Sequence, residues 1–241
     1  MTNENKPICI MIIGPNGAGK STFYHNILKQ NSFFKDIEYV NFDDKYSKMA
    51  SQSSPNVNKN ILMGLTGRVV LEQINKNIQN RKSFIYETTS AGKSQFNIIK
   101  YAKAQNFQIM TMFIGLSNVN LSIMRVKERV AHGGHNIPEN DIIRRYPMII
   151  KNFPEFLNVS DIFFIFDNSG IQPFRLIFAK TNDSNHVFAK FPKYITNSLN
   201  DYGFDSDVIS ITNEKFKKLT PEEYNILIRD IVSRIKLYTS L

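Results

Sequence analysis

The sequence predicts an α/β fold in which a mostly parallel β-sheet is covered by helices on both faces. Short apolar runs, typical of buried parallel strands, recur along residues 1–170. Segments with apolar residues at helical spacing separate these runs, and a glycine-rich turn follows the first of them. Because strands and helices alternate, a parallel sheet is favoured over an antiparallel one.

The first part of the chain supplies two strands and two helices in turn. The run ICIMII predicts a strand over 8–13, and the glycine turn after it leads into a helix over about 20–29. IEYVNF predicts a second strand over 37–42, whereas the polar residues 45–58 are expected to be irregular. A long helix over 60–79 follows from apolar residues at helical spacing, namely Ile61, Leu65, Val69, Ile74 and Ile78.

The middle of the chain continues the same alternation. Strands are expected at 83–87, 107–116 and 161–170, and helices at 94–104, 118–131 and 138–157. Pro138 stands at the start of the last helix, where its missing N–H costs nothing. These elements complete an alternating core that ends at Gly170.

The pattern changes after Gly170. Two apolar segments, QPFRLIFAK and HVFAKF, flank TNDSN and predict a β-hairpin. A capping box, Thr220 with Glu223, begins a closing helix over 220–238. No long linker separates this part, so residues 171–241 are expected to pack on the same domain as residues 1–170.

The composition is that of a globular protein without disulfide bonds. Hydrophobic residues make up 42% of the 241 residues and charged residues 21%. The one cysteine, Cys9, lies in an apolar run, which indicates a reducing compartment. MTNENKP lacks the order of a signal peptide, and no run approaches the roughly 18 apolar residues of a membrane span. We therefore expect a cytoplasmic protein without a membrane partner.

The net charge of +9 favours anionic partners. Most of the excess lies within residues 1–170, together with the candidate chemistry and not in a basic tail. Aromatic residues do not interleave with a basic stripe, so nucleic acid is an unlikely partner.

A phosphate-binding loop is the most specific motif. GPNGAGKST contains the pattern G-x-x-x-x-G-K-[ST] between an apolar strand and a helix, which is the context that the motif requires. Lys20 is expected to reach the β- and γ-phosphates, and the Ser21 hydroxyl to ligate Mg²⁺. ATP or GTP with Mg²⁺ is thus the predicted cofactor. The residues expected to bind the nucleotide are Gly14, Pro15, Asn16, Gly17, Ala18, Gly19, Lys20, Ser21 and Thr22.

Acids follow three of the expected strands. In doubly wound sheets, ligands bind at the carboxyl ends of strands, and transfer to a hydroxyl needs a carboxylate to deprotonate it. Asp43 is the best candidate for this base, and Asp44 is the alternative. Glu87, with Thr88 and Thr89 beside it, could bind acceptor hydroxyls.

The third acid, Asp167, ends the run IFFIFD. This run has the hydrophobic-then-Asp shape of a Walker B strand, but it lies late in the chain, and the signature LSGGQ of transport ATPases is absent. Asp167 is as well suited to capping the turn at 168–170 as to meeting a ligand.

A basic stretch, RVAHGGHNIPENDIIRRY, predicts a helical lid over about 118–157. Arg125 and Arg129 lie four apart on one helical face, and a shared anion would relieve their repulsion. Gly133 and Gly134 end that helix, and Arg144 and Arg145 lie on the next. Arginines on both arms can close over a triphosphate. His132 and His135 form no larger ligand cluster, so a metal bound by histidines is disfavoured.

The ordered set GPNGAGKST, VNFDD, FIYETT, RVKERVAHGGHNIPENDIIRRY and FDNSG resembles the zeta-toxin family of P-loop kinases, over about residues 8–170. The match is closest to its chromosomal GGH-V-P-E branch. The resemblance implies a P-loop kinase-like fold and Mg²⁺-dependent transfer of a phosphoryl group from ATP or GTP. Characterised members phosphorylate a UDP-activated amino sugar, UDP-N-acetylglucosamine, on a sugar hydroxyl and act as toxins. A neutralising antitoxin would then be a separate protein.

The resemblance also implies roles for particular residues. Lys20 matches the P-loop lysine, Ser21 the magnesium ligand, and Asp43 the catalytic base. Glu87 and Thr88 fall in the acceptor-binding ETT motif, and Arg129 matches the first lid arginine. The second lid contact falls on His135, Arg144 or Arg145. We assign the catalytic role to Arg145 and substrate binding to Asp44, Glu87, Thr88, Thr89, Arg125, His135 and Arg144.

Two other functions stay open at this level. The same site could phosphorylate another nucleotide, a cofactor or an RNA end. Alternatively, the chain could bind nucleotide as a non-catalytic module.

Overall fold

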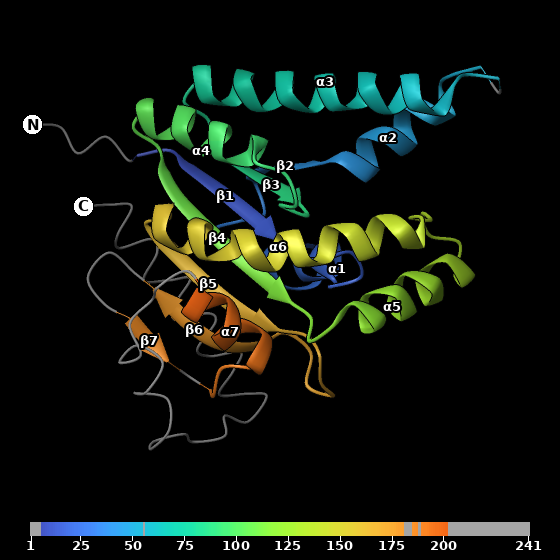
Figure 1. The fold of residues 1–241 in the computed structure, drawn as a ribbon. Coiled ribbons are helices and arrows are strands. Elements are labelled where there is room, and N and C mark those ends of the chain that lie inside the picture. Colours follow the sequence, from blue (N-terminus) through green and yellow to red (C-terminus); the bar gives the residue numbers. More distant parts are fainter. Residues whose placement is uncertain (1–5, 55, 181–184, 188, 202–241) are drawn as a thin grey trace, which may run out of the picture.

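A seven-stranded sheet forms the centre of the computed structural model, which describes residues 6–54, 56–180, 185–187 and 189–201. The strand order is β2-β3-β1-β4-β5-β6-β7 (Figure 1). The first five strands in this order pair in parallel, and β5, β6 and β7 pair antiparallel. The strands are β1 (Ile8–Ile13), β2 (Glu38–Asn41), β3 (Phe84–Thr88), β4 (Gln108–Gly115), β5 (Ile162–Asp167), β6 (Arg175–Lys180) and β7 (Asn185–Val187).

Helices connect the parallel strands, as the sequence predicts. They are α1 (Lys20–Phe23), α2 (Phe42–Ser51), α3 (Lys59–Gln79), α4 (Ser94–Ala104), α5 (Val119–Ala131), α6 (Glu139–Val159) and α7 (Lys193–Asp201), with a π-helix, η1 (Tyr24–Leu28), directly after α1. The α/β architecture with a mostly parallel sheet is therefore confirmed. The expected hairpin is present as β6 and β7, whereas the helix expected at 220–238 lies outside the described residues.

Three details of the helices differ from the expectation. Of the residues expected to be irregular, 45–58, the first half, 45–51, belongs to α2, whose cap Asn41 accepts a hydrogen bond from the Asp44 N–H. The apolar residues Phe42, Tyr46 and Met49 have helical spacing, but none of them is fully buried, and the expectation of an irregular segment was wrong here. The helix expected at 20–29 divides into α1 and η1. Helix α7 was not expected, although Pro192 precedes it.

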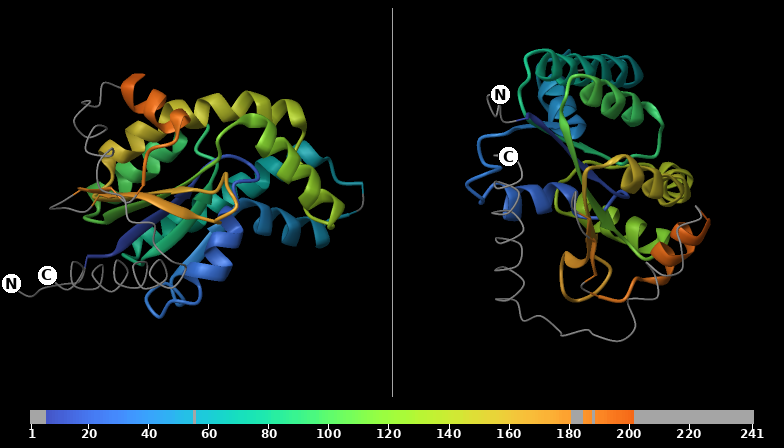
Figure 2. Two further views of the ribbon diagram at one scale, coloured as in Figure 1. Left: turned by 90° about the horizontal axis from the view of Figure 1, so that it is seen from below. Right: turned by 90° about the vertical axis from the view of Figure 1, so that its left-hand side faces the viewer.

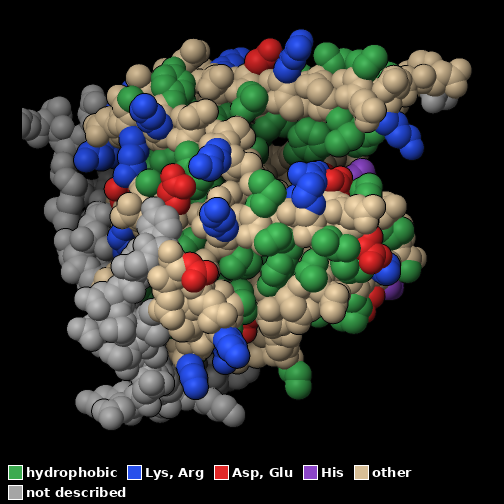
Figure 3. All heavy atoms as spheres, viewed as in Figure 1, with side chains coloured by type: hydrophobic (Ala, Val, Ile, Leu, Met, Phe, Trp, Pro, Cys, Tyr) green, Lys and Arg blue, Asp and Glu red, His purple; other side chains and the backbone are tan. Residues whose placement is uncertain are grey.

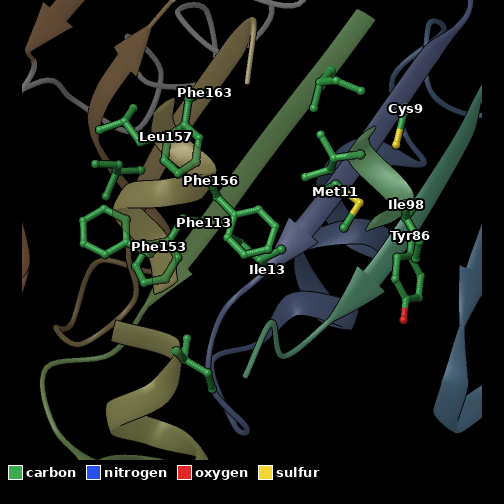
Figure 4. Close-up of a cluster of buried hydrophobic side chains, with 14 of the residues drawn as sticks. Cys9, Met11, Ile13, Tyr86, Ile98, Phe113, Phe153, Phe156, Leu157 and Phe163 are labelled. Atoms are coloured by element: carbon green, nitrogen blue, oxygen red, sulfur yellow. The ribbon is translucent and has the colours of Figure 1, made fainter. Parts of the chain in front are cut away.

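Two apolar layers cover the faces of the sheet (Figure 2). On one face, side chains of α3, α4, α6 and α7 pack against β1, β3, β4 and β5, with Phe113, Phe153 and Phe163 among the residues of this layer (Figure 4). On the other face, Phe23 and Leu28 of α1 and η1 pack against the opposite side of the strands. Burial of both faces explains why β1 is apolar without alternation.

The strand order determines where the site forms. Strand β1 lies between β3 and β4, so the loop after β1 emerges beside the carboxyl end of β3. Asn41, at the end of β2, is paired with Glu87, and Glu87 is paired with Ile12. Among the described residues, no helix combines the length and apolar character needed to cross a bilayer.

Candidate active site

The phosphate-binding loop is tightly enclosed by its neighbours. Gly14 has φ 145°, and a Cβ atom there would lie 2.1 Å from the Ile114 carbonyl oxygen. Gly19 has φ 84°, and a Cβ there would lie 3.0 Å from Asn168 Nδ2. Both positions therefore require glycine for conformation and for space. Contacts with residues far along the chain thus explain why glycine stands at these two positions of the motif.

Lys20 lies at the start of α1 with its ammonium group buried inside the loop. Its Nζ donates to the carbonyl oxygens of Gly14 and Pro15, each at 3.0 Å. Burial lowers the pKa of Lys20 from its usual value because it disfavours the charged form. The carboxylates of Glu87 and Asp43 act in the opposite direction, and the charge of Arg129 lowers the pKa further. These groups thus lie within electrostatic reach of Lys20.

Ser21, the expected magnesium ligand, contacts Glu87 directly. The Ser21 hydroxyl donates to Glu87 Oε1 at 3.1 Å, and the Tyr39 hydroxyl donates to Oε2 of the same carboxylate. Glu87 is 9% exposed. Strand β3 carries this acid next to β1, whereas Asp167 lies on β5, which β4 separates from β1. Glu87, and not Asp167, is therefore the strand-end acid that lies beside the phosphate loop.

The oxygen atoms at Ser21 and Glu87 suit Mg²⁺. Hydroxyl and carboxylate oxygens are its preferred ligands, and nucleotide phosphates usually complete its coordination. Among the described residues, no group of three or more His, Cys, Asp and Glu side chains could hold a metal alone. This donor set fits an ion that arrives with a nucleotide.

Asp43 and Asp44 lie in the first turn of α2, directly after β2. Acids in this position are stabilised by the helix dipole. Asp43 is half-buried and faces the charge of Lys20, whereas Asp44 is exposed. The two candidates for the base therefore differ in their surroundings, and Asp43 is the one beside the phosphate loop.

The segment after Glu87 forms a polar turn. Gln95 Nε2 donates to the Thr88 hydroxyl oxygen at 3.1 Å, and Thr89 is half-buried beside it. Ser90 has φ 60°, and Asn152 Nδ2 of α6 donates to its carbonyl at 3.0 Å. The turn is thus held between α4 and α6, at the carboxyl end of β3. Nearby, a hollow between α3 and α6 has hydrophobic side chains in its wall (Figure 3).

The first arm of the lid, α5, packs on the phosphate loop. The Ser122 hydroxyl donates to the Asn16 carbonyl. A Cβ atom at Gly17 would lie 3.2 Å from Arg125 Cβ, so Arg125 contacts the loop through its stem. Arg129 Nη2 donates to the His135 carbonyl at 2.6 Å, while its buried Nε has no hydrogen-bond partner among the described residues. The His135 ring contacts Tyr46 of α2 edge-on at 5.8 Å, which links the lid to the helix of Asp43.

On the second arm, α6, both remaining arginines form ion pairs with the same acid, Asp141. Arg144 Nη2 lies 2.8 Å from Asp141 Oδ1, and Arg145 Nη2 lies 3.5 Å from Asp141 Oδ2. The Arg145 side chain is 29% exposed and that of Arg144 62%. In the described part of the chain, both arginines pair with Asp141 and neither forms a hydrogen bond with the phosphate loop, so the second lid contact stays a prediction.

Asp167 and Asn168 close the other side of the loop. Asp167 accepts from Ser169, Arg175 and Tyr194, which agrees with a role in the turn after β5. Asn168 Nδ2 donates to the Ala18 carbonyl at 2.9 Å, and its Oδ1 accepts from the Phe174 N–H at 3.1 Å. Asn168 therefore ties the phosphate loop to the segment that leads into β6.

Sequence reasoning missed three residues that shape the site. The Tyr39 hydroxyl donates a hydrogen bond to the Glu87 carboxylate. Asn168 donates to the Ala18 carbonyl, and Ser122 donates to the Asn16 carbonyl. Asn168 belongs to FDNSG, which predicts a turn and contributes to the family resemblance, but the motif assigns no contact to Asn168. Tyr39 and Asn41 are two residues apart on β2, so their side chains lie on the same face of the strand. This spacing from a residue at the strand end was the available signal for Tyr39.

Comparison with known proteins identifies the relatives. The sequence profile of the zeta toxin family matches residues 1–174. An uncharacterized protein of Haemophilus influenzae is 31% identical over 143 residues, which are 59% of this chain and 94% of that protein.

Solved structures share the fold. A chain of the PezAT chromosomal toxin–antitoxin system of Streptococcus pneumoniae is 16% identical, with a TM-score of 0.55 over 100% of this chain and 89% of that chain. A chain of the AvrRxo1-ORF1:-ORF2 complex with ATP is 10% identical, with a TM-score of 0.62 over 95% of this chain and 76% of that chain. Both likenesses concern the arrangement of the elements.

Proposed function

The chain belongs to the zeta toxin family, and from this premise we propose that it is a Mg²⁺-dependent kinase. It transfers the γ-phosphoryl group of ATP or GTP to a hydroxyl of a small molecule. The proposed acceptor is a UDP-activated amino sugar such as UDP-N-acetylglucosamine, and the proposed role is that of a toxin of a toxin–antitoxin pair.

One observation carries the proposal. A buried Lys20 in the phosphate loop lies within electrostatic reach of Asp43, Glu87 and Arg129, which come from three other segments of the chain. A nucleotide-binding module needs the lysine alone. A carboxylate and an arginine near this lysine add a proton acceptor and a further positive charge, which transfer to a hydroxyl requires.

Each group has a proposed part in the reaction. Asp43 accepts the proton of the acceptor hydroxyl, whose oxygen then attacks the γ-phosphorus while the bond to the β-phosphate oxygen breaks. Lys20 and Arg129 offset the charge on the transferring group. Mg²⁺, when bound, neutralises charge on the phosphates, and Ser21 with Glu87 would hold it.

The lid has two further proposed contacts. Arg125 and Arg145 approach the phosphates from α5 and α6 when nucleotide is bound. For Arg145 this requires release from Asp141, an exchange of one anion for another. Residues 1–170 are the proposed kinase core, with the lid at about 118–157. Of the C-terminal part that was expected to pack on the same domain, residues 202–241 lie outside the described residues.

The acceptor is proposed from the family. Glu87 and Thr88 lie at the carboxyl end of β3, and Thr89 follows directly. These three residues, with Asp44, His135 and Arg144, are proposed to contact the sugar nucleotide. A structural neighbour was solved as part of a toxin–antitoxin system, which supports a separate antitoxin as the partner. We place the reaction in the cytoplasm, where sugar nucleotides are made.

The test combines transfer and growth. Purified protein with Mg²⁺ and γ-labelled ATP or GTP is offered sugar nucleotides, other nucleotides, cofactors and RNA ends. Label on UDP-N-acetylglucosamine, with growth arrest on expression, supports the proposal. Label on another class of acceptor would show that the acceptor is not a sugar nucleotide. No transfer to any class would contradict a kinase and favour a non-catalytic nucleotide-binding module.

A further inference from the structure

Tyr39 lies outside the recognised motifs, yet its hydroxyl contacts Glu87 in the candidate metal site. Strand β2 places it at the edge of the sheet, two residues before the cap of α2. Its hydroxyl donates to Glu87 Oε2 and accepts from Asn41 Nδ2 at 3.0 Å. The hydroxyl is thus fully engaged, with its one proton directed at Glu87.

The ring of Tyr39 is fixed by a second aromatic ring. Tyr24 stacks on it with ring centroids 3.7 Å apart and an interplanar angle of 6°. Tyr24 is the first residue of η1, the π-helix that follows the short phosphate-loop helix α1. π-helical turns are frequent at functional sites. The continuous helical segment of α1 and η1, which starts at Lys20, therefore also provides the ring that stacks on Tyr39.

Each of the two oxygens of Glu87 accepts a hydrogen bond from a different hydroxyl group. Ser21 donates to Oε1, and Tyr39 donates to Oε2. A glutamate has several rotatable bonds, and an unsupported carboxylate beside Lys20 would be free to turn towards that ammonium group. Tyr39 leaves the carboxylate facing Ser21. The Ser21 oxygen keeps its lone pairs for another ligand, because it donates its proton to Glu87.

We propose that Tyr39 is a positioning residue for the nucleotide-bound Mg²⁺, acting through Glu87 and held by stacking on Tyr24. Hydrogen-bond partners of metal-site ligands commonly tune metal affinity in this way. The inference rests on the proposed nucleotide site. It does not depend on which acceptor is phosphorylated.

A purely structural role makes a different prediction. If Tyr39 only fills space between Tyr24 and the sheet, then phenylalanine serves as well, because the ring and its stacking remain. If the hydroxyl positions Glu87, then phenylalanine weakens the response to Mg²⁺ and leaves metal-free nucleotide binding intact.

The experiment compares Tyr39→Phe with Tyr24→Phe in the full chain. Both variants retain the stacked rings, but only the first loses the hydroxyl that reaches Glu87. Binding of a fluorescent ATP analogue is titrated with Mg²⁺ and, separately, in EDTA. Thermal melting of each variant checks that both remain folded, and Tyr24→Leu adds a variant that keeps the Tyr39 hydroxyl but removes its support.

We expect Tyr39→Phe to raise the half-saturating Mg²⁺ concentration by about 10-fold, at the lower end of the range for partners of metal ligands. Its affinity for the analogue in EDTA should match that of the wild type, and Tyr24→Phe should match the wild type in both conditions. Tyr24→Leu should fall between the two. Equal Mg²⁺ responses of Tyr39→Phe and Tyr24→Phe would overturn the inference.

The two proposals fail in distinguishable ways. If the wild type binds the analogue with Mg²⁺ but transfers no phosphate to any acceptor, the proposed function fails and the Tyr39 comparison still stands. If transfer occurs but the two phenylalanine variants respond alike, the Tyr39 inference alone fails. A wild type that binds no nucleotide contradicts both.

Discussion

The hydroxyl of Ser21 donates a 3.1 Å hydrogen bond to the carboxylate of Glu87, although 66 positions separate the two residues. Ser21 lies at the start of α1, and Glu87 lies near the end of β3. Their contact follows from the strand order, which places β3 beside β1. It links the phosphate loop to the rest of the candidate active site.

Glu87→Gln tests this link. The amide keeps the shape of the side chain but lacks the negative charge that faces Lys20 and the proposed metal. We expect Mg²⁺-dependent transfer to fall by about 10- to 100-fold. Nucleotide binding in EDTA should change little, and fluorescence titrations in both conditions measure the difference. Unchanged transfer would contradict a metal role for Glu87.

Lys20→Ala tests the phosphate loop. The change removes the cation that would neutralise charge on the transferring group, so turnover should fall by at least about 100-fold. It also removes a buried charge with two carbonyl contacts. Circular dichroism and thermal melting should show a folded protein. Full turnover in the folded variant would exclude Lys20 from catalysis.

Asp43→Asn tests the proposed base. Loss of the proton acceptor should lower the transfer rate by about 100-fold or more, while the affinity for ATP stays near that of the wild type. Asp36→Asn is the matched control, because Asp36 is exposed and precedes the opposite end of β2. The rate with a saturating acceptor, measured for both variants, decides the assignment.

Arg145→Ala tests the second lid contact. If Arg145 leaves Asp141 to meet the transferring phosphoryl group, its loss should lower kcat by about 100-fold, as for other single donors to a transition state. Arg144→Ala should have a smaller effect, because that side chain is the more exposed of the two. Lys127→Ala, which removes another exposed lid cation, serves as the control. A larger loss in Arg144→Ala would reverse the assignment.

Asn168→Ala tests the tie between β5 and the phosphate loop. The change leaves the Ala18 carbonyl and the Phe174 N–H without the partner that Asn168 supplies, so we expect a loss of about 1–3 kcal/mol in the free energy of unfolding. Nucleotide should bind more weakly to the loosened loop. Urea unfolding with and without ATP measures both effects. A stability equal to that of the wild type would show that these contacts of Asn168 do not stabilise the fold.

The sequence predicts most of the fold because local signals coincide with the elements. The apolar run of β1 and the glycine turn after it define the phosphate loop without reference to the rest of the chain. Helix α2 was not predicted, although Phe42, Tyr46 and Met49 have helical spacing and Asn41 caps its start. Polar residues stand between these apolar positions, and none of the three is fully buried, so the pattern is weak. Helix α7 had a usable signal in Pro192 and in the spacing of Ile195 and Leu199.

The site was predictable in part. Lys20, Asp43, Glu87 and Arg129 were each found by motif, and the structure brings them together around the phosphate loop. The contact of Glu87 with Ser21 could not be foreseen, since it requires the order of strands that are distant in sequence. Tyr39 could not be found by motif, because its role depends on a stacked partner in η1.

The proposed function depends on phosphoryl transfer to a sugar nucleotide with Asp43 as the base. Mass spectrometry of UDP-N-acetylglucosamine after incubation with ATP, Mg²⁺ and purified protein measures this transfer. We expect a product heavier by one phosphoryl group with the wild type and with Asp36→Asn, and almost none with Asp43→Asn. An unmodified sugar nucleotide with the wild type, or equal product with Asp43→Asn, would contradict it.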